Sequence, residues 1–283
     1  MGLNDKTLPS PVVPSVGRGV AGDLDPRVVV EDAQAYVVGR GSIDIEDLGD
    51  VVLRHMPFSP HYWYGAAVRP RFSDADGDQR INDVRGWFRD RGRQEFIWMV
   101  GESATPADLV DRLIASGANL DEEDPIALGM ILDHEPPPGP PDIDIRRVAT
   151  FDDFRESAQI TMADVPAEAW AATEANLPTA WHEARDNEDI YTFLAFIDGR
   201  PVANGQIVWL TNGLPYLGGA ATLSEYRGRG AFRALVRARW DEAIARGVPT
   251  LLVQAGQMSE PILRSLGFES TGRITILHDR SGL

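Results

Sequence analysis

The strongest constraint on the fold is a glycine-rich turn between an apolar run and an amphipathic helix. The apolar run Leu217–Leu223 is followed by the turn Tyr226–Gly230, whose last four residues read Arg-Gly-Arg-Gly. Free backbone N–H groups and the positive end of the helix dipole converge at a helix start, and glycine lets an anion approach the backbone closely. The turn therefore predicts a phosphate site, to which Arg227, Arg229 and Arg233 add positive charge.

The pattern after the turn predicts a helix that ends at Arg246-Gly247, a basic last turn followed by glycine. Its apolar residues recur at three- and four-residue spacing, which places them on one face. That face comprises Phe232, Leu235, Val236, Trp240, Ala243 and Ile244, and the polar residues Arg237, Arg239, Asp241 and Glu242 are expected elsewhere on the helix. A strand over 250–254 follows, and then a short helix, Ser259–Leu266, that closes with Gly267-Phe268.

These elements resemble the GNAT acetyltransferase superfamily over roughly residues 142–283. The acetyl-CoA motif of that family is (Arg or Gln)-x-x-Gly-x-(Gly or Ala), which Arg227 to Ala231 fit, whereas Phe232 departs from it at the last position. The ending Leu266-Gly267-Phe268 of the short helix also looks like the family. The other interpretation of the turn is a helix-start loop that carries surface arginines.

The resemblance implies how acetyl-CoA, as co-substrate, is held. Backbone N–H groups of Gly228, Arg229, Gly230, Ala231, Phe232 and Arg233 would surround the pyrophosphate. The strand before the turn would splay from its neighbour and pair with the pantetheine arm through Thr222, Leu223 and Ser224. The backbone of Thr222 and Leu223 would also polarise the thioester carbonyl. An ordinary core strand over Leu217–Leu223 is compatible with the same role.

Composition limits the remaining classes. The chain has 283 residues, enough for one large or two ordinary domains, and no cysteine, which excludes disulfides, thiolate metal sites and cysteine nucleophiles. The net charge of −16 argues against nucleic acid as a partner, because neutralising phosphates requires a basic face. It is compatible with a cationic amine substrate, and equally with simple solubility. No apolar run is long enough to cross a membrane and no signal-peptide pattern is present, so we expect a cytoplasmic location.

Five prolines in residues 136–141 mark the clearest boundary, because such a run forms neither a helix nor a central strand. We therefore predict a flexible arm over 1–24, a first domain over 25–135, a stiff linker over 136–141 and an acetyl-CoA-binding domain over 142–283. The fold class is α/β with a mixed sheet. Two GNAT-like domains are expected, each with a mostly antiparallel central sheet flanked by helices, and with a splayed strand pair.

The first domain looks like a degenerate copy of the second. A strand over Phe96–Gly101 and a helix from Thr105-Pro106, with Leu109, Leu113 and Ile114 on one face, parallel the later strand and short helix. A helix over about 77–92 would match the helix after Gly230. Its start carries Asp74, Asp76 and Asp78, which would repel a pyrophosphate. A calcium loop does not fit there, because positions six and twelve are Gln79 and Arg85. No metal site is predicted.

The acid and the base of the reaction are less defined by the sequence. Where the family often has a tyrosine and an asparagine, this chain has Leu263 and Gly256. The candidate catalytic residues are Tyr216, on the strand that leads to the acetyl site, and His182, because histidine is a residue type suited to proton transfer. Glu183, Tyr191 and His278 are further candidates, and His278 is more often structural. Trp170, Trp181 and Trp209 could shape an acceptor pocket or simply fill the core.

The sequence thus predicts a GNAT-type N-acetyltransferase that moves an acetyl group from acetyl-CoA to the amine of a small molecule by direct attack. Two alternatives stay open. One is a CoA-binding protein without transferase activity. The other is acylation of a protein or peptide amine, or transfer of a larger acyl group. The acceptor itself, the acyl length and the oligomeric state do not follow from the sequence.

Overall fold

The structure is a computed structural model that describes residues 24–39, 43–57, 61–165 and 167–280. The arm expected over 1–24 lies outside these residues except for Leu24. Among the described helices, none combines the length and the apolarity that crossing a bilayer requires.

The first half supplies three helices and six strands to the described chain. These are α1 (Pro26–Val29), β1 (Asp44–Asp47), β2 (Val52–His55), β3 (Gly65–Val68), α2 (Gly77–Asp90), β4 (Phe96–Gly101), α3 (Leu109–Ala115), β5 (Asn119–Leu120) and β6 (Ile126–Leu132).

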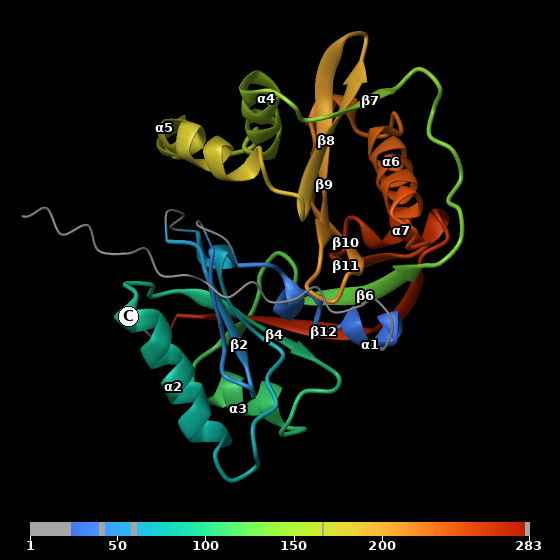
Figure 1. Cartoon of the computed structure of the whole chain (residues 1–283). Helices are drawn as coiled ribbons and strands as arrows, with labels where there is room; N and C mark the ends of the chain where they lie inside the picture. The colour runs from blue at the N-terminus through green and yellow to red at the C-terminus, as the bar shows by residue number, and fades with distance from the viewer. Residues whose placement is uncertain (1–23, 40–42, 58–60, 166, 281–283) are drawn as a thin grey trace, which may run out of the picture.

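The second half follows the order expected from the resemblance, β-α-α-β-β-β-α-β-α-β. Its elements are β7 (Asp144–Arg147), α4 (Phe151–Thr161), α5 (Ala167–Ala184), β8 (Ile190–Ile197), β9 (Arg200–Trp209), β10 (Pro215–Thr222), α6 (Ala231–Ala245), β11 (Leu251–Ala255), α7 (Glu260–Ser265) and β12 (Glu269–Asp279). Helices α4 and α5 lie on one side of the strands of this half, and α6 and α7 lie on the other (Figure 1).

The two halves share one mixed sheet, in which each half inserts a strand into the other. The strand order is β1-β2-β3-β4-β12-β6-β11-β10-β9-β8-β7, with β5 paired to β12. Strand β6 of the first half pairs antiparallel with both β11 and β12, and β12 also pairs antiparallel with β4 (Figure 1). The parallel pairs β3–β4 and β10–β11 flank this exchange on either side, as an internal repeat requires.

The largest core cluster lies between α6, α7 and the strands of the second half. Leu235, Ala243 and Leu263 are fully buried in it, as the helical spacing predicts. Two apolar residues were placed wrongly by the same reasoning, because Ile244 is 46% exposed and Ile114 is 45% exposed. Both lie at the end of a helix, on the edge of the apolar face, where no neighbouring element covers them.

Arg239 is the other correction, because this residue of α6 faces the sheet and its side chain is fully buried. Its Nε donates to the Leu235 carbonyl at 2.9 Å and its Nη1 donates to the Gln206 carbonyl at 3.2 Å. Its Nη2 has no hydrogen-bond partner among the described residues. Burial lowers the pKa of Arg239 to about 9, so the guanidinium stays charged at neutral pH. The space for it exists because Gly205 has no side chain: a Cβ there would lie 3.1 Å from Arg239 Cζ.

Arg239→Met is expected to change the free energy of unfolding by no more than about 1 kcal/mol, because relief of the buried charge offsets the lost hydrogen bonds. Arg239→Ala also leaves a cavity and is expected to cost about 3 kcal/mol. Urea unfolding of the two variants measures both values. A loss as large for methionine as for alanine would mean that the charge itself stabilises the fold.

Candidate acetyl-CoA site

The site begins where β10 and β11 separate. These parallel strands are paired at Tyr216 and Leu252, and beyond that pair β10 continues to Thr222 without a described strand on this edge. A β-bulge between Leu217 and Ala220 accompanies the separation, opposite β9. An unpaired strand edge presents free N–H and C=O groups, to which an extended amide-containing arm can add as a strand does.

The bulge also determines which backbone groups face the opening. The N–H of Leu223 donates to the Val202 carbonyl at 2.9 Å, so it is not available to polarise a thioester. Alternate residues of a strand direct their N–H groups to opposite edges, which leaves Thr222 for the open side. The N–H of Ala221 donates to the buried side chain of Asn204 at 3.0 Å, and Asn204 in turn donates to Ser157 and Thr161 of α4. Asn204 therefore fixes the bulged strand to α4.

The glycine-rich turn lies at the start of α6. Gly228 and Gly230 have φ angles of 78° and 89°, in the left-handed region that favours glycine. Gly230 is the N-cap of α6 and no side chain caps the helix, so its first N–H groups are left for a ligand. A Cβ at Gly228 would meet nothing within 4 Å, whereas one at Gly230 would lie 2.5 Å from Pro140 of the linker. The turn is thus open at Gly228 and closed by the linker at Gly230.

The three arginines predicted to serve this turn are at the surface. Arg227 is 56% exposed, donates to the Thr222 carbonyl at 3.3 Å and pairs with Asp164 at 3.4 Å. Arg229 is 45% exposed and lies 4.0 Å from Asp198. Arg233 is exposed on the first turn of α6. These weak surface pairs leave the guanidinium groups able to turn toward an anion.

The corresponding place in the first half is closed. Strands β3 and β4 pair at Ala66–Ile97, Ala67–Trp98 and Val68–Met99, and a parallel bridge between Arg71 and Thr105 continues the contact. The start of α2 is occupied by Arg112, which lies 3.7 Å from Asp78 and 3.9 Å from Asp74. The described part of the first half therefore has neither a splayed edge at this place nor a helix start free of side chains.

Residues 148–268 match the acetyltransferase (GNAT) family. This segment begins just before α4 and ends after α7, and it contains the splayed strand and the glycine-rich turn.

Residues 148–268 are a GNAT domain.

Solved structures are similar in fold over most of the chain, not over the GNAT domain alone. A GCN5-related N-acetyltransferase from Kribbella flavida is 18% identical, with a TM-score of 0.67 over 92% of this chain and 96% of the other. A tandem GNAT protein from the clavulanic acid biosynthesis pathway is 17% identical, with a TM-score of 0.58 over 93% and 90%. A GCN5-related N-acetyltransferase from Sphaerobacter thermophilus is 20% identical, with a TM-score of 0.55 over 83% and 82%. A search of curated proteins returned no match. The chain therefore has the fold of a tandem GNAT protein.

The two candidate catalytic residues lie on different elements of the GNAT domain, Tyr216 on β10 and His182 on α5. Tyr216 is buried, and its hydroxyl accepts a hydrogen bond from Gln34 at 2.8 Å and lies 3.5 Å from Gln254. Burial raises the pKa of Tyr216, which makes it a poor base at neutral pH. His182 is exposed on the last turn of α5. His278 is buried against the ring of Tyr62, with a centroid distance of 3.9 Å, which is a packing role.

The positions that often carry the family's acid are apolar in this domain. Leu263 of α7 is fully buried in the hydrophobic core, and a Cβ at Gly256 would lie 2.6 Å from Asp124 Oδ1. A tyrosine and an asparagine therefore do not fit there without rearrangement.

Two features of the site were missed from the sequence although a signal exists. The adjacent glycines Gly218 and Gly219 inside an apolar run are typical of a bulge. The buried Arg239 follows Leu235 by four residues and precedes Ala243 by four, which places it on the apolar face. The local pattern does not reveal Asn204, because its partners come from α4.

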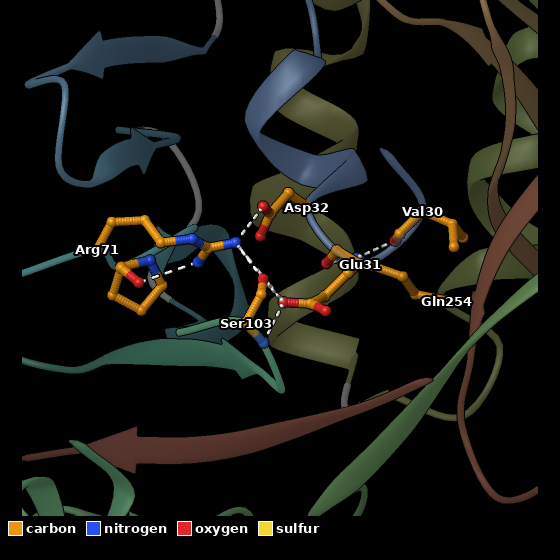
Figure 2. A network of polar contacts seen from close by, with 7 residues as sticks. Val30, Glu31, Asp32, Arg71, Ser103 and Gln254 are labelled. Atoms are coloured by element: carbon orange, nitrogen blue, oxygen red, sulfur yellow. Dashed lines mark hydrogen bonds and ion pairs between the residues drawn. The ribbon is translucent and has the colours of Figure 1, made fainter. Parts of the chain in front are cut away.

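The segment after α1 makes polar contacts with residues of both halves (Figure 2). Gln254 of β11 donates to the carbonyls of Val30 and Glu31 at 3.0 and 2.8 Å. In the first half, Arg71 donates a hydrogen bond to Asp32 at 2.6 Å and another to Ser103. Ser103 in turn donates hydrogen bonds to Glu31 (Figure 2). This network fixes the segment beside the strand that borders the site.

Burial raises the pKa of Asp32 from 3.8 to about 6, against the lowering effect of Arg71. The folded protein therefore binds a proton at the Asp32 carboxyl more tightly than the unfolded chain does. The protonated carboxyl stabilises the fold at low pH, and this contribution is lost as the pH rises from about 4 through about 6. A pKa shift of this size corresponds to a change of at most about 3 kcal/mol in the free energy of unfolding. Asp32→Asn is expected to gain about 1 to 3 kcal/mol relative to the wild type between pH 4 and 7.5.

Urea unfolding at several pH values measures this change. The exposed substitution Asp133→Asn is the control and is expected to follow the wild type. If the difference between Asp32→Asn and the wild type is the same at every pH, the carboxyl of Asp32 is not destabilised by burial.

Proposed function

We propose that this chain is an N-acetyltransferase that uses acetyl-CoA in its GNAT domain and acetylates the amine of a small molecule by direct attack. The observation that carries the proposal is the separation of β10 from β11, which ends at the uncapped, glycine-rich start of α6. One opening thus combines an unpaired strand edge for an amide-containing arm with free N–H groups for a pyrophosphate.

The residues present fit acetyl-CoA. Bound there, it would supply a thioester: a C–N bond would form between the amine nitrogen and the carbonyl carbon, the C–S bond would break with its electron pair on the departing thiolate, and the proton that the nitrogen loses would pass to water. The N–H groups from Gly228 to Arg233 would hold the pyrophosphate, and Arg229 would add charge. The free edge at Thr222 would orient the arm and offer an N–H to the carbonyl oxygen.

The proton balance of this step needs no acid at position 263. A thiol has a pKa of roughly 8.5, so the thiolate is a fair leaving group near neutral pH. Neither Tyr216, which is buried and hydrogen-bonded, nor the exposed His182 is required by this scheme as a base. Water that enters through the open edge of β10 can take the proton from the amine.

A CoA-binding protein without transferase activity is the second candidate function. The buried Leu263 at the position of the family's tyrosine favours it, because no hydroxyl stands there to protonate the thiolate. A third candidate, acylation of a peptide amine, has no specific observation in its favour.

Calorimetric titration of the purified full chain with acetyl-CoA and with CoA tests the proposal, with mass spectrometry to follow the thioester in the presence of a panel of primary amines. We expect binding of both compounds and transfer of the acetyl group to at least one amine. Binding with an intact thioester across the panel would favour the non-catalytic alternative. Absence of binding would contradict the placement of the site.

A further inference from the structure

A cavity of about 290 Å³ lies on the face of the sheet that α4 and α5 cover. Its floor is formed by β8 and β9, and its wall by the last two turns of α5. Both halves of the chain contribute to it. The apolar groups include Phe154, Trp181 and Ile190 from the second half, and Val38, Ile43 and Met56 from the first.

One wall of this cavity, Gln206, lies next to the bulge of β10. Gln206 lines the cavity from β9, opposite the bulge, and its Nε2 lies 3.4 Å from Thr192 Oγ1. A Cβ at Gly218 would lie 3.1 Å from Gln206 Cβ, 3.2 Å from Val208 Cγ2 and 3.3 Å from Gln206 Oε1. The side chains of Gln206 and Val208 therefore cover the bulge at Gly218, and the side chain of Gln206 alone separates the cavity from the splayed strand there.

The residues that line the cavity favour some classes of amine over others. Aromatic and aliphatic side chains form most of the named walls, which favours a compact apolar body. The charged groups that line it are Arg147, Arg185 and Glu183, a positive excess that disfavours a polycation. The volume corresponds to about ten water-sized groups. An arylalkyl monoamine has this size, one nitrogen and an apolar ring.

We propose that this cavity binds the acceptor substrate, and that the acceptor is a primary arylalkylamine whose ring lies against Trp181 and Phe154 and whose nitrogen lies beside Gln206. The inference rests on the proposed function and adds the substrate class. Among the described residues no donor bonds Gln206 Oε1, so this oxygen can accept a hydrogen bond from the amine. Gln206 is in this role a positioning residue, because it directs the nitrogen toward the bulge while the proton leaves through water.

The test is direct binding of 2-phenylethylamine to the full chain by calorimetry, with and without CoA, next to spermidine as a polycation of similar reach. Ala184 lines the cavity, and Ala184→Leu fills part of it; Ala175→Leu on the exposed face of the same helix is the matched control. We expect 2-phenylethylamine to bind more tightly than spermidine, and Ala184→Leu to weaken binding at least about tenfold. The control is expected to bind as the wild type does.

Equal binding to the wild type and to Ala184→Leu, or preferential binding of spermidine, would overturn the inference. The readout separates it from the proposed function, since amine binding without CoA reports the cavity alone. If spermidine or another amine is acetylated while 2-phenylethylamine neither binds nor reacts, the transferase stands and the acceptor assignment fails. If 2-phenylethylamine binds as expected but acetyl-CoA does not, the cavity stands and the proposed function fails.

Discussion

The double substitution Arg227→Glu/Arg229→Glu is expected to weaken the binding of acetyl-CoA at least about 100-fold, with little change in melting temperature. Each hydrogen bond from a charged group contributes about 1.5 to 3 kcal/mol, and each 1.4 kcal/mol is a tenfold change in affinity. Both side chains are about half exposed, and their described contacts are surface ion pairs, a 3.3 Å hydrogen bond from Arg227 to the Thr222 carbonyl and a contact of Arg229 with the ring of Tyr226, so the fold depends little on them. Calorimetry with CoA and acetyl-CoA measures the loss.

Arg89→Glu/Arg91→Glu at the end of α2 is the control, because it changes the net charge by the same amount in the first half. This control is expected to retain the affinity of the wild type. Micromolar binding by the Arg227/Arg229 variant, with the control unchanged, would remove the phosphate site from the start of α6. The variant is a cleaner test than a bulky residue at Gly230, where the contact with Pro140 and the φ of 89° would also strain the fold.

The fragment 142–283 is expected not to fold by itself, although a linker separates it from the rest of the sequence. Strand β6 lies between β11 and β12, so removing the first half leaves both strands with an unpaired edge. It also removes Met130 and Leu132, which are fully buried in the core under α6 and α7. Loss of two such side chains costs about 4 to 10 kcal/mol, comparable to the stability of a whole domain.

Circular dichroism and thermal unfolding of the isolated fragment check this expectation, with no cooperative transition as the expected result. Co-expression of 24–137 with 142–283 is the control, because a break in the linker leaves the shared sheet intact; the two pieces are expected to purify together. A cooperative, monomeric fragment 142–283 would show that β12 can find another place in the sheet without β6.

The sequence predicted local elements well because their signals are local. The strand, turn and helix around Arg227–Gly230 follow from helix capping and glycine geometry, which involve neighbours in the chain. The acidic start of α2 is likewise a local signal, from which the sequence predicts that the first half does not hold a pyrophosphate. Residues at the rim of a helix face, such as Ile244, were misplaced because spacing does not reveal where the covering element ends.

The cavity proposed to bind the acceptor could not be predicted in this way. The cavity beneath α5 combines Met56 of the first half with Trp181 and Gln206 of the second, and nothing in the separate segments indicates that they meet. Asp32 is a further example: its raised pKa comes first from burial, to which the negative charge of the neighbouring Glu31 adds a smaller effect, and the sequence does not reveal that burial.

By itself, the sequence determined the order of strands and helices in the second half, the glycine-rich turn before α6 and the acidic residues at the start of α2. These features depend on backbone conformation, helix dipoles and the alternation of apolar residues, all of which act over a few neighbouring positions. Only the tertiary structure decided the exchange of β6 and β12, the separation of β10 from β11, the burial of Arg239 and the cavity beside Gln206. Each of these results from pairing between residues far apart in the chain, where burial and hydrogen bonding are shared between elements that no local pattern connects.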